Sequence, residues 1–350
     1  MEPVTHFLTG ACLARTGFNR KTAYATLAMT LAAEAPDIDI FWGFGGPVTA
    51  FRHHRGITHT LIAAPLLAAV TVGAVYLWHR FKTRKILRSA QRPRWLMLWL
   101  LAMLAHCSHL LLDYTNNYGL RPFFPFSGKW YEADLVFIVE PLLLAVLIIA
   151  LVLPLILRLV DQEISNTKQP YRRNKYRGRT FAVIALTFMV ALWFLRAVEH
   201  HRAIALTIEE SPPNEFVQRT AAEPYPVNPF RWHTIVDAGP YYRAAEVDTL
   251  GQLVNSDPTQ DVFYKPADTP ATLAAKKSPL GRVYLDWSKY PLVEESGKYG
   301  KWTEVTFRDL RFTYFGFAFL AGDSPPLSAS EQIAPDGTIS EVRINGHNQN

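Results

Sequence analysis

Long apolar runs alternate with short polar segments over the first two hundred residues of this 350-residue chain. A helix needs roughly 20 apolar residues to cross the hydrocarbon core of a bilayer. Four runs reach that length, and each predicts a membrane-spanning helix: Thr60–Trp78, Trp95–Tyr114, Leu135–Val160 and Thr180–Val198. The third run contains two prolines, which a span tolerates when neighbouring helices satisfy the freed carbonyls.

Two shorter apolar patterns, Val4–Ala14 and Thr22–Ala35, precede the first span. Gly17 and Asn19 lie between them and favour a helix end and a turn. Neither pattern is long enough to span a bilayer, so we expect an antiparallel helical hairpin. Such a hairpin can be re-entrant within the bundle or lie on the membrane surface, and both arrangements stay open at this point.

The chain changes character after residue 200, where long apolar runs end. Residues 201–229 are polar and rich in proline, which predicts a connector. Alternating patterns beyond it predict strands at Arg231–Asp237, Tyr242–Leu250, Trp302–Phe312, Thr313–Leu320 and Ile339–Ile344, and helices at Thr269–Lys277 and Gly281–Lys289. The expected fold is a polytopic α-helical membrane domain, residues 1–200, followed by a small extramembrane α+β domain with an antiparallel sheet, residues 230–350.

The charges divide at the same boundary. Residues 200–350 hold 14 Lys+Arg and 19 Asp+Glu, and the rest of the chain holds 22 and 11. The segments His79–Arg94 and Asp161–Arg179 are strongly basic, so the positive-inside bias places them in the cytoplasm. The loop Thr115–Asp134 and the acidic C-terminal domain should then lie outside, in the periplasm of a bacterium. Because the basic residues belong to membrane loops, we expect membrane lipids and no nucleic acid as partners.

Histidines and aspartates gather at the ends of the apolar segments, where ionisable groups are costly unless they serve a function. In Pro36-Asp37-Ile-Asp39, an extended chain would direct both carboxylates to one side, which suits a metal ion. A solvated turn or helix cap is the alternative. Given the orientation above, the groups from His59 onward reach the outer face, and the hairpin can bring His6 and Asp37 there.

Two further motifs carry imidazoles. In His53-His-Arg-Gly-Ile-Thr-His59, Gly56 permits a sharp turn that lets His54 and His59 converge on one ion, and Arg55 could hold an anionic group. A loop with interfacial anchors is the alternative. In His106-Cys-Ser-His-Leu-Leu-Leu-Asp113, the spacing places His106, His109 and Asp113 on one helical face. Hydrogen bonds between helices are the alternative explanation of this second motif.

Imidazole and carboxylate groups are the usual ligands of zinc and similar divalent ions. The candidate ligands are His6, Asp37, Asp39, His54, His59, His109 and Asp113. The candidate catalytic residues are Asp39, Arg55 and Asp134. The two cysteines, Cys12 and Cys107, exclude a disulfide framework, and the chain contains no nucleotide-binding loop and no serine-hydrolase motif.

These motifs, in this order, resemble the YdjM-like family of bacterial inner-membrane metal-dependent hydrolases. The likeness rests on His6, the motifs that contain Asp37, His59 and Asp113, Tyr118-Gly119, and the stretch from Asp134 to Pro141. It covers most of residues 1–200; Arg231-Trp232 and Asp309-Leu-Arg-Phe312 are similar to the outer domain of longer members. Glu140 departs from the family pattern, in which aspartate is expected. The resemblance implies a multi-pass inner-membrane protein with metal-dependent hydrolase activity.

The leading hypothesis is therefore a metallohydrolase at the periplasmic membrane surface that uses a metal-activated water, with a lipid or lipid-linked phosphoester as substrate. A proton-coupled transporter that uses the same groups as a relay is one alternative. The other is a metal-stabilised scaffold whose C-terminal domain binds a protein partner. Apart from membrane lipids, the substrate and partners stay open.

Overall fold

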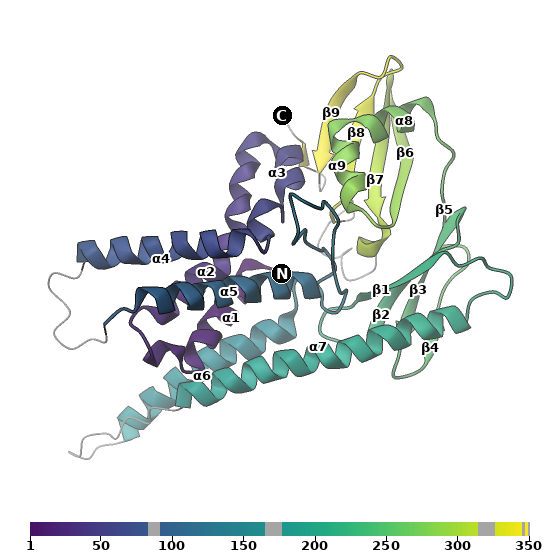
Figure 1. The fold of residues 1–350 in the computed structure, drawn as a ribbon. Helices are drawn as coiled ribbons and strands as arrows, with labels where there is room; N and C mark the ends of the chain where they lie inside the picture. The colour runs from purple at the N-terminus through teal and green to yellow at the C-terminus, as the bar shows by residue number, and fades with distance from the viewer. Residues whose placement is uncertain (83–91, 165–176, 314–325, 345–346, 349–350) are drawn as a thin grey trace. The chain divides into compact units, whose positions relative to one another are not determined.

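The computed structural model describes residues 1–82, 92–164, 177–313, 326–344 and 347–348 (Figure 1). The chain divides into two compact units. Unit 1 comprises Met1–Asp39 and Arg55–Leu195; unit 2 comprises Ile40–His54 and Arg196–Asn350. The short segment Ile40–His54 thus interrupts the sequence of unit 1 but belongs to unit 2.

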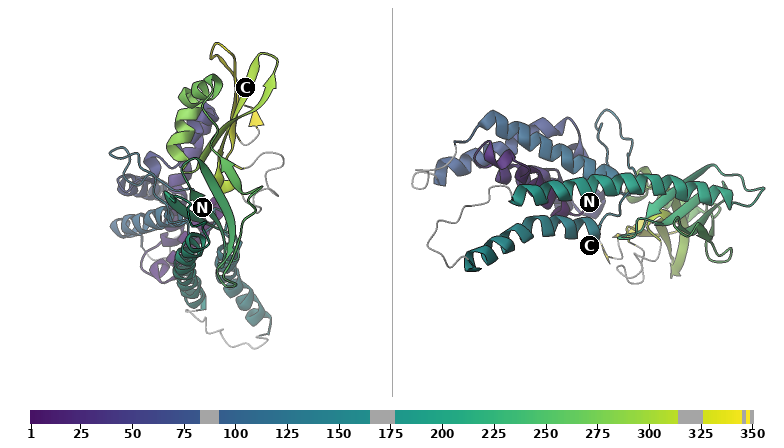
Figure 2. Two further views of the ribbon diagram at one scale, coloured as in Figure 1. Left: turned by 90° about the vertical axis from the view of Figure 1, so that its right-hand side faces the viewer. Right: turned by 90° about the horizontal axis from the view of Figure 1, so that it is seen from below.

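Unit 1 is helical. Its α-helices are α1 (Pro3–Arg15), α2 (Ala25–Glu34), α4 (Ala63–Lys82), α5 (Trp95–Thr115), α6 (Pro141–Ile164) and the first part of α7 (Arg177–Glu209), the long teal helix of Figures 1 and 2. Three short 3-10 helices join them: η1 (Phe18–Arg20), η3 (Ile57–His59) and the start of η2 (Ala35–Gly45). Proline at the first position of α1 and α6 fixes a backbone angle that favours the start of a helix.

Three described helices are long and apolar enough to cross a membrane: α5, α6 and α7. A fourth candidate exists if the bent pair Pro47–His59 and Ala63–Phe81 is counted as one span. The expected third span begins too early, at Leu135. The helix starts at Pro141, because Val136 forms a parallel bridge with Asn116 and holds the preceding residues extended.

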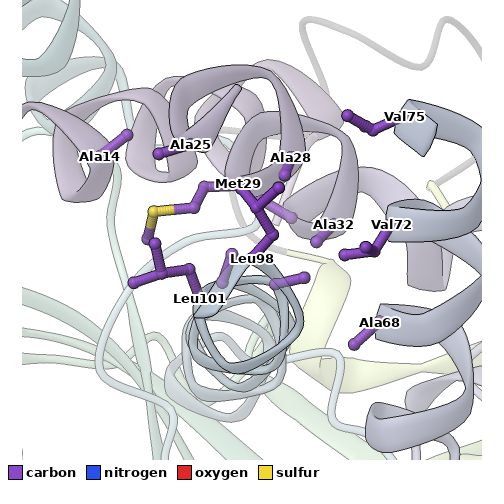
Figure 3. Close-up of a cluster of buried hydrophobic side chains, with 13 residues drawn as sticks. Ala14, Ala25, Ala28, Met29, Ala32, Ala68, Val72, Val75, Leu98 and Leu101 are labelled. Atoms are coloured by element: carbon purple, nitrogen blue, oxygen red, sulfur yellow. The ribbon is translucent and has the colours of Figure 1, made fainter. Parts of the chain in front are cut away.

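Small side chains let the helices of the N-terminal hairpin pack closely. Alanines of α1 and α2 pack with side chains of α4 and α5 in one buried cluster, part of which is labelled in Figure 3. A Cβ atom added at Gly10 would lie 2.7 Å from the carbonyl oxygen of Met29 and 2.9 Å from the Cβ of Ala33. The predicted hairpin is therefore present, and it is packed against other helices of unit 1 along α2.

Unit 2 contains two antiparallel sheets. The first has the order β1-β2-β3-β4, with β5 also paired to β3: β1 Arg219–Pro224, β2 Arg231–Asp237, β3 Tyr241–Asp248, β4 Leu253–Asn255 and β5 Val262–Tyr264. The second has the order β10-β9-β8-β7-β6: β6 Pro291–Tyr299, β7 Trp302–Asp309, β8 Ala329–Ile333, β9 Ile339–Ile344 and β10 His347–Asn348. The helices are α3 (Pro47–His53), α8 (Pro270–Lys277) and α9 (Pro279–Trp287), with a 3-10 turn η4 at Leu310–Phe312.

Several expected boundaries in this half differ from the structure. The expected fourth span ends too early, because α7 continues to Glu209, where Ala203 packs against Trp232 and Thr207 Oγ1 donates to Thr234 Oγ1 at 3.0 Å. The expected connector 201–229 thus contains the end of α7 and strand β1. The expected strand Trp302–Phe312 ends in η4, and the expected strand Thr313–Leu320 lies almost wholly outside the described residues.

Candidate metal centre

Four elements of unit 1 bring histidines and aspartates to one place. Helix α1 contributes His6, η2 contributes Asp37, η3 contributes His59, and α5 contributes His109 and Asp113. The last two lie one helical turn apart, which directs both to the same face of α5. All five side chains are buried except that of Asp37, which is 24% exposed.

Four atoms in this group are spaced as the ligands of one metal ion would be. His59 Nε2 lies 3.4 Å from both Asp37 Oδ1 and Asp113 Oδ2. His109 Nε2 lies 3.6 Å from Asp37 Oδ1, 3.3 Å from Asp113 Oδ2 and 3.1 Å from His59 Nε2. A tetrahedral zinc site with ordinary bond lengths has edges of about 3.3–3.4 Å. Five of the six edges therefore fit such an ion, and we call these four atoms the tetrahedral set.

His6 belongs to a second group with His109 and Asp113, whose ligand atoms lie within 4.8 Å of one another. Its ring stacks on that of His109 at 3.7 Å between centroids, and its Nε2 lies 3.4 Å from Asp113 Oδ1. His6 therefore flanks the tetrahedral set: Asp113 presents Oδ1 to His6 and Oδ2 to His59 and His109, so its carboxylate could bridge two ions.

Backbone and carboxylate acceptors orient the two imidazoles of the tetrahedral set. His109 Nδ1 lies 2.7 Å from the carbonyl oxygen of Ala33, which can only accept, so Nδ1 carries the proton and Nε2 presents its lone pair. His59 Nδ1 lies 3.4 Å from Asp39 Oδ2 and 3.1 Å from Thr58 Oγ1. In metal-ligating histidines, the nitrogen that does not bind the metal typically donates its N–H to a carboxylate or a backbone carbonyl, and these contacts match that pattern.

Arg55 and Asn116 hold the remaining carboxylate. Asp113 Oδ1 accepts from Arg55 Nη2 at 2.8 Å and from the α-amino group of Met1, and Asn116 Nδ2 donates to it at 3.3 Å. Arg55 Nη1 donates to Asn116 Oδ1 at 3.1 Å and to the carbonyl oxygen of Gly119 at 2.9 Å. These bonds fix the carboxylate of Asp113 with Oδ2 directed at the two histidines.

Several buried polar atoms of the centre have no hydrogen-bond partner in the described part of the chain. They are Asp113 Oδ2, Asp37 Oδ2 and both ring nitrogens of His6. A buried, unsatisfied polar atom is costly, and a bound cation removes that cost. Burial alone would raise the pKa of Asp37, but its hydrogen bond with His59, the largest of the opposing causes, holds that pKa below its ordinary value. This direction favours the carboxylate form of Asp37, which is the form that binds a metal ion.

Two predicted ligands take other positions. Asp37 and Asp39 were expected to point the same way from an extended chain, but η2 is a 3-10 helix, in which residues two apart lie on different sides. Asp39 Oδ2 instead accepts from the backbone N–H of Arg55 at 2.7 Å, behind His59. His54 is in neither group, because Arg55 adopts a left-handed conformation (φ 50°) and turns the chain between His54 and η3.

The remaining predicted site residues are also placed. Arg55 is 3% exposed and its guanidinium contacts protein acceptors, so an anion-holding role has no support from this geometry. Asp134 is in neither group of the described residues and has a positive φ of 53°. Sequence reasoning missed Asn116 and the carbonyl of Ala33. Asn116 could have been found from its spacing of three residues from Asp113. The contact of His109 with the carbonyl oxygen of Ala33 could not, because every residue has a backbone carbonyl.

Comparisons with known proteins agree with the motifs. The family described as "YdjM inner membrane protein" matches residues 1–203. The uncharacterized protein YfhP of Bacillus subtilis (strain 168) is 29% identical over 149 residues, which cover 40% of this chain and 42% of that protein, so the match spans less than half of the relative. No solved structure matches the chain. Because the family match covers more than half of the sequence, the predicted resemblance is confirmed, and the chain belongs to the YdjM inner membrane protein family.

Proposed function

We propose that this protein is a membrane-bound metal-dependent hydrolase. Its divalent ion, zinc foremost, would be held by Asp37, His59, His109 and Asp113. The observation that supports the proposal is the set of four ligand atoms, 3.1–3.6 Å apart along five measured edges, in a buried site. A ligand set of imidazoles and carboxylates without thiolates is typical of catalytic zinc, whereas structural zinc sites are usually rich in cysteine.

A divalent ion bound here would lower the pKa of a water molecule toward neutrality and so supply a nucleophile. In the hydrolysis, the water oxygen bonds to the electrophilic atom of the substrate and the bond to the leaving oxygen breaks. The proton lost by the water ends on the leaving oxygen. We assign Asp37 to carry it, because its Oδ2 has no hydrogen-bond partner among the described residues and its side chain is the most exposed of the four.

Asp39 and Arg55 then serve as positioning residues. Asp39 orients the ring of His59. Its carboxylate also accepts a hydrogen bond from the backbone N–H of Arg55, which holds the two ends of the segment from residue 39 to residue 55 together. Arg55 fixes Asp113. In this proposal, positioning roles take the place of the catalytic role expected for Asp39 and the anion-holding role expected for Arg55. A base role for Asp134 stays a prediction without support from the geometry.

The proposal keeps the expected location of the site at the periplasmic membrane face. The basic segments on which that orientation rests lie largely in residues 83–91 and 165–176, outside the described residues. The periplasmic placement of the C-terminal domain rests on the same loop charges. Cysteine labelling from outside intact cells would test both placements, with Ser127→Cys in the loop of unit 1 for the first and Ser296→Cys in the C-terminal domain for the second.

Metal-loaded protein in lipid nanodiscs tests the activity. A panel of phosphomonoesters, phosphodiesters, carboxylic esters and peptides is incubated with the unmodified chain and with Asp113→Asn. We expect hydrolysis of at least one class, lost with a chelator and in the variant. Metal-independent flux driven by a pH gradient in vesicles would instead favour the transporter alternative.

The metal-stabilised scaffold is the second candidate, and one observation favours it. Four protein groups already offer ligand atoms that lie 3.1–3.6 Å apart along five edges, as in closed structural sites, whereas catalytic sites usually keep a position for water. Stoichiometric metal without hydrolysis of any member of the panel would support this candidate. The C-terminal domain would then be the part that binds a partner.

A further inference from the structure

The loop between α5 and α6 carries an exposed apolar tip. Helix α5 ends at Thr115 and α6 begins at Pro141; both belong to unit 1, and both are long and apolar enough to cross a membrane. Phe123 and Phe126 lie near the middle of the loop and are 48% and 83% exposed. Pro125, between them, is exposed as well. We call these three residues the loop tip.

Contacts within the loop hold the tip in place. Leu120 and Tyr131 exchange two backbone hydrogen bonds, at 3.0 and 2.9 Å, and so close the loop on either side of the tip. The guanidinium of Arg121 lies over the rings of Phe124 and Trp130, at 5.2 and 4.6 Å from their centroids. The loop tip is therefore presented by a folded segment, and its exposure is a property of the fold.

The exposed apolar surface of α4 continues to the loop tip. Leu66 and Val70 lie one turn apart in α4, and both are exposed. Just before α4, Leu61 and Ile62 are 51% and 54% exposed. The backbone N–H of Leu61 donates to the carbonyl oxygen of Pro122, the residue before the tip, at 3.1 Å. All of these residues belong to unit 1, so the tip and α4 form one apolar surface within one compact unit.

The charges of the loop suit a lipid surface. Of the four charged side chains from residue 116 to residue 134, Lys129 is exposed and lies 5.3 Å from the centroid of the Tyr131 ring. Arg121 is 8% exposed, and both carboxylate oxygens of Glu132 and Oδ1 of Asp134 are buried. Lysine and tyrosine at the end of a span are typical of the membrane interface, where the ammonium group reaches lipid phosphates.

Lipid is the occupant that these observations favour. A contiguous exposed apolar surface marks a contact with protein or with membrane. Here the surface continues toward α4 in a chain of an inner membrane protein family, and the exposed charge beside it is positive. Protein interfaces instead surround their apolar centre with polar side chains.

We propose that the loop tip inserts into the bilayer beside α4, among the acyl chains just below the head groups, with the residues that follow it, as far as Lys129, at the level of the phosphates. The loop would then lie back on the membrane instead of extending into water. This contact would fix the depth of the end of α5, and with it the depth of His109 and Asp113. It does not depend on any reaction at the metal centre.

The first arm of the test leaves the tip intact. A Cβ atom added at Gly128 meets no heavy atom within 4 Å, so a spin label fits there. Full-length protein with Cys107→Ser and Gly128→Cys is labelled and placed in phosphatidylethanolamine and phosphatidylglycerol vesicles; Cys12 is buried and stays. Power saturation compares collisions of the label with oxygen, which concentrates in lipid, and with a water-soluble nickel chelate.

Two further labels define the scale. Leu66→Cys, on the exposed side of α4, gives the oxygen-to-nickel ratio in lipid, and Ser296→Cys, at an exposed polar position of β6, gives the ratio in water. We expect the ratio at Gly128 to lie between these two values. A ratio equal to that of the Ser296→Cys label would overturn the inference and leave the tip free for a protein partner.

The second arm asks whether the phenylalanines cause the contact. The test variant adds Phe123→Ser and Phe126→Ser to the protein labelled at Gly128. The matched control adds Phe41→Ser and Phe44→Ser, two phenylalanines also three residues apart and 60% and 90% exposed. We expect the oxygen-to-nickel ratio to fall to its value in water in the test variant and to stay unchanged in the control. An equal ratio in the unmodified tip and in both variants would overturn the inference, and the first arm decides it alone if the test variant does not fold.

Discussion

The Nε2 atoms of His59 and His109 lie 3.1 Å apart although the two residues are 50 positions apart in the sequence. Both side chains are fully buried. Two imidazole nitrogens at this distance share either a proton or a metal ion. Because His109 donates from Nδ1 to Ala33, its Nε2 offers a lone pair, and Asp37 and Asp113 place carboxylate oxygens beside the same pair. The surrounding negative charge favours a cation.

The two aspartates of the Asp37-Ile-Asp39 motif should differ in their effect on metal binding. Asp37→Asn removes a ligand, whereas Asp39→Asn removes the carboxylate that lies behind His59 and accepts from the Arg55 N–H, and it leaves the four ligands in place. We expect Asp39→Asn to retain the full metal stoichiometry at saturation with about 10–100-fold weaker affinity. Competition with a chromogenic chelator measures both quantities. An equal loss of bound metal in Asp37→Asn and Asp39→Asn would show that Asp39 is a ligand as well.

His6 should not be needed for the first ion. Its ring stacks on that of His109, but the tetrahedral set offers four ligand atoms that do not include those of His6. In His6→Gln we expect one ion per chain to remain, measured by elemental analysis of the purified protein after dialysis. A fall to zero ions would make His6 a required ligand, and a fall from two to one would establish a second site.

Arg55 should contribute to stability through Asp113. Removal of one partner of a buried ion pair typically costs about 3–5 kcal/mol. We expect Arg55→Leu to lower the stability of unit 1 by an amount of this order. Because Asp113→Asn removes the same contact, the double variant should lose less than the sum of the two single losses. Thermal unfolding in detergent, with metal removed from all samples, measures the loss of stability in the two single variants and in the double variant. If the loss in the double variant equals the sum of the two single losses, Arg55 and Asp113 are not energetically coupled.

Glu331 in strand β8 should make unit 2 less stable at alkaline pH. Burial raises the pKa of Glu331 to about 7 from its ordinary value of 4.5, although Ser278 Oγ donates to it at 2.9 Å. The folded chain therefore binds the proton more tightly than the unfolded chain, and stability falls as pH rises from 4.5 to about 7. The deficit above that pH is on the order of 1–3 kcal/mol.

Glu331→Gln removes the ionisation, so the variant should be more stable than the unmodified protein at pH 8.5 and close to it at pH 4.5. Pulse proteolysis of unit 2 in urea, with the full chain in detergent, measures the difference at each pH. The same change at an exposed glutamate, Glu209→Gln, is the control. A difference that is equal at both pH values would contradict the assignment.

The sequence predicts the helices of unit 1 well, because apolar length has a direct physical meaning in a membrane protein. The start of α6 was placed too early because hydropathy does not register the bridge between Asn116 and Val136. The membership of Ile40–His54 in unit 2 could not be predicted, since it depends on tertiary packing. Phe51 of α3 contacts Tyr284 and Trp287 of α9, at 5.9 and 5.3 Å between ring centroids.

The site could be predicted in part for similar reasons. Helical spacing alone joins His109 to Asp113. The different roles of Asp37 and Asp39 depend on whether this segment is extended or helical, and the extended chain expected there is wrong because residues 35–45 form a 3-10 helix. The exclusion of His54 depends on the left-handed backbone of Arg55, a residue that rarely adopts it.

Metal content is the measurement that tests the central claim most directly. The unmodified protein, His109→Gln and His106→Gln are purified without chelators and analysed for bound metal by mass spectrometry. His106 is a buried histidine of the same helix that is in neither ligand group of the described residues, so it controls for the loss of an imidazole. The account predicts stoichiometric metal in the unmodified protein and in His106→Gln, and loss of metal in His109→Gln. No stoichiometric metal in the unmodified protein, or equal loss in both variants, would contradict it.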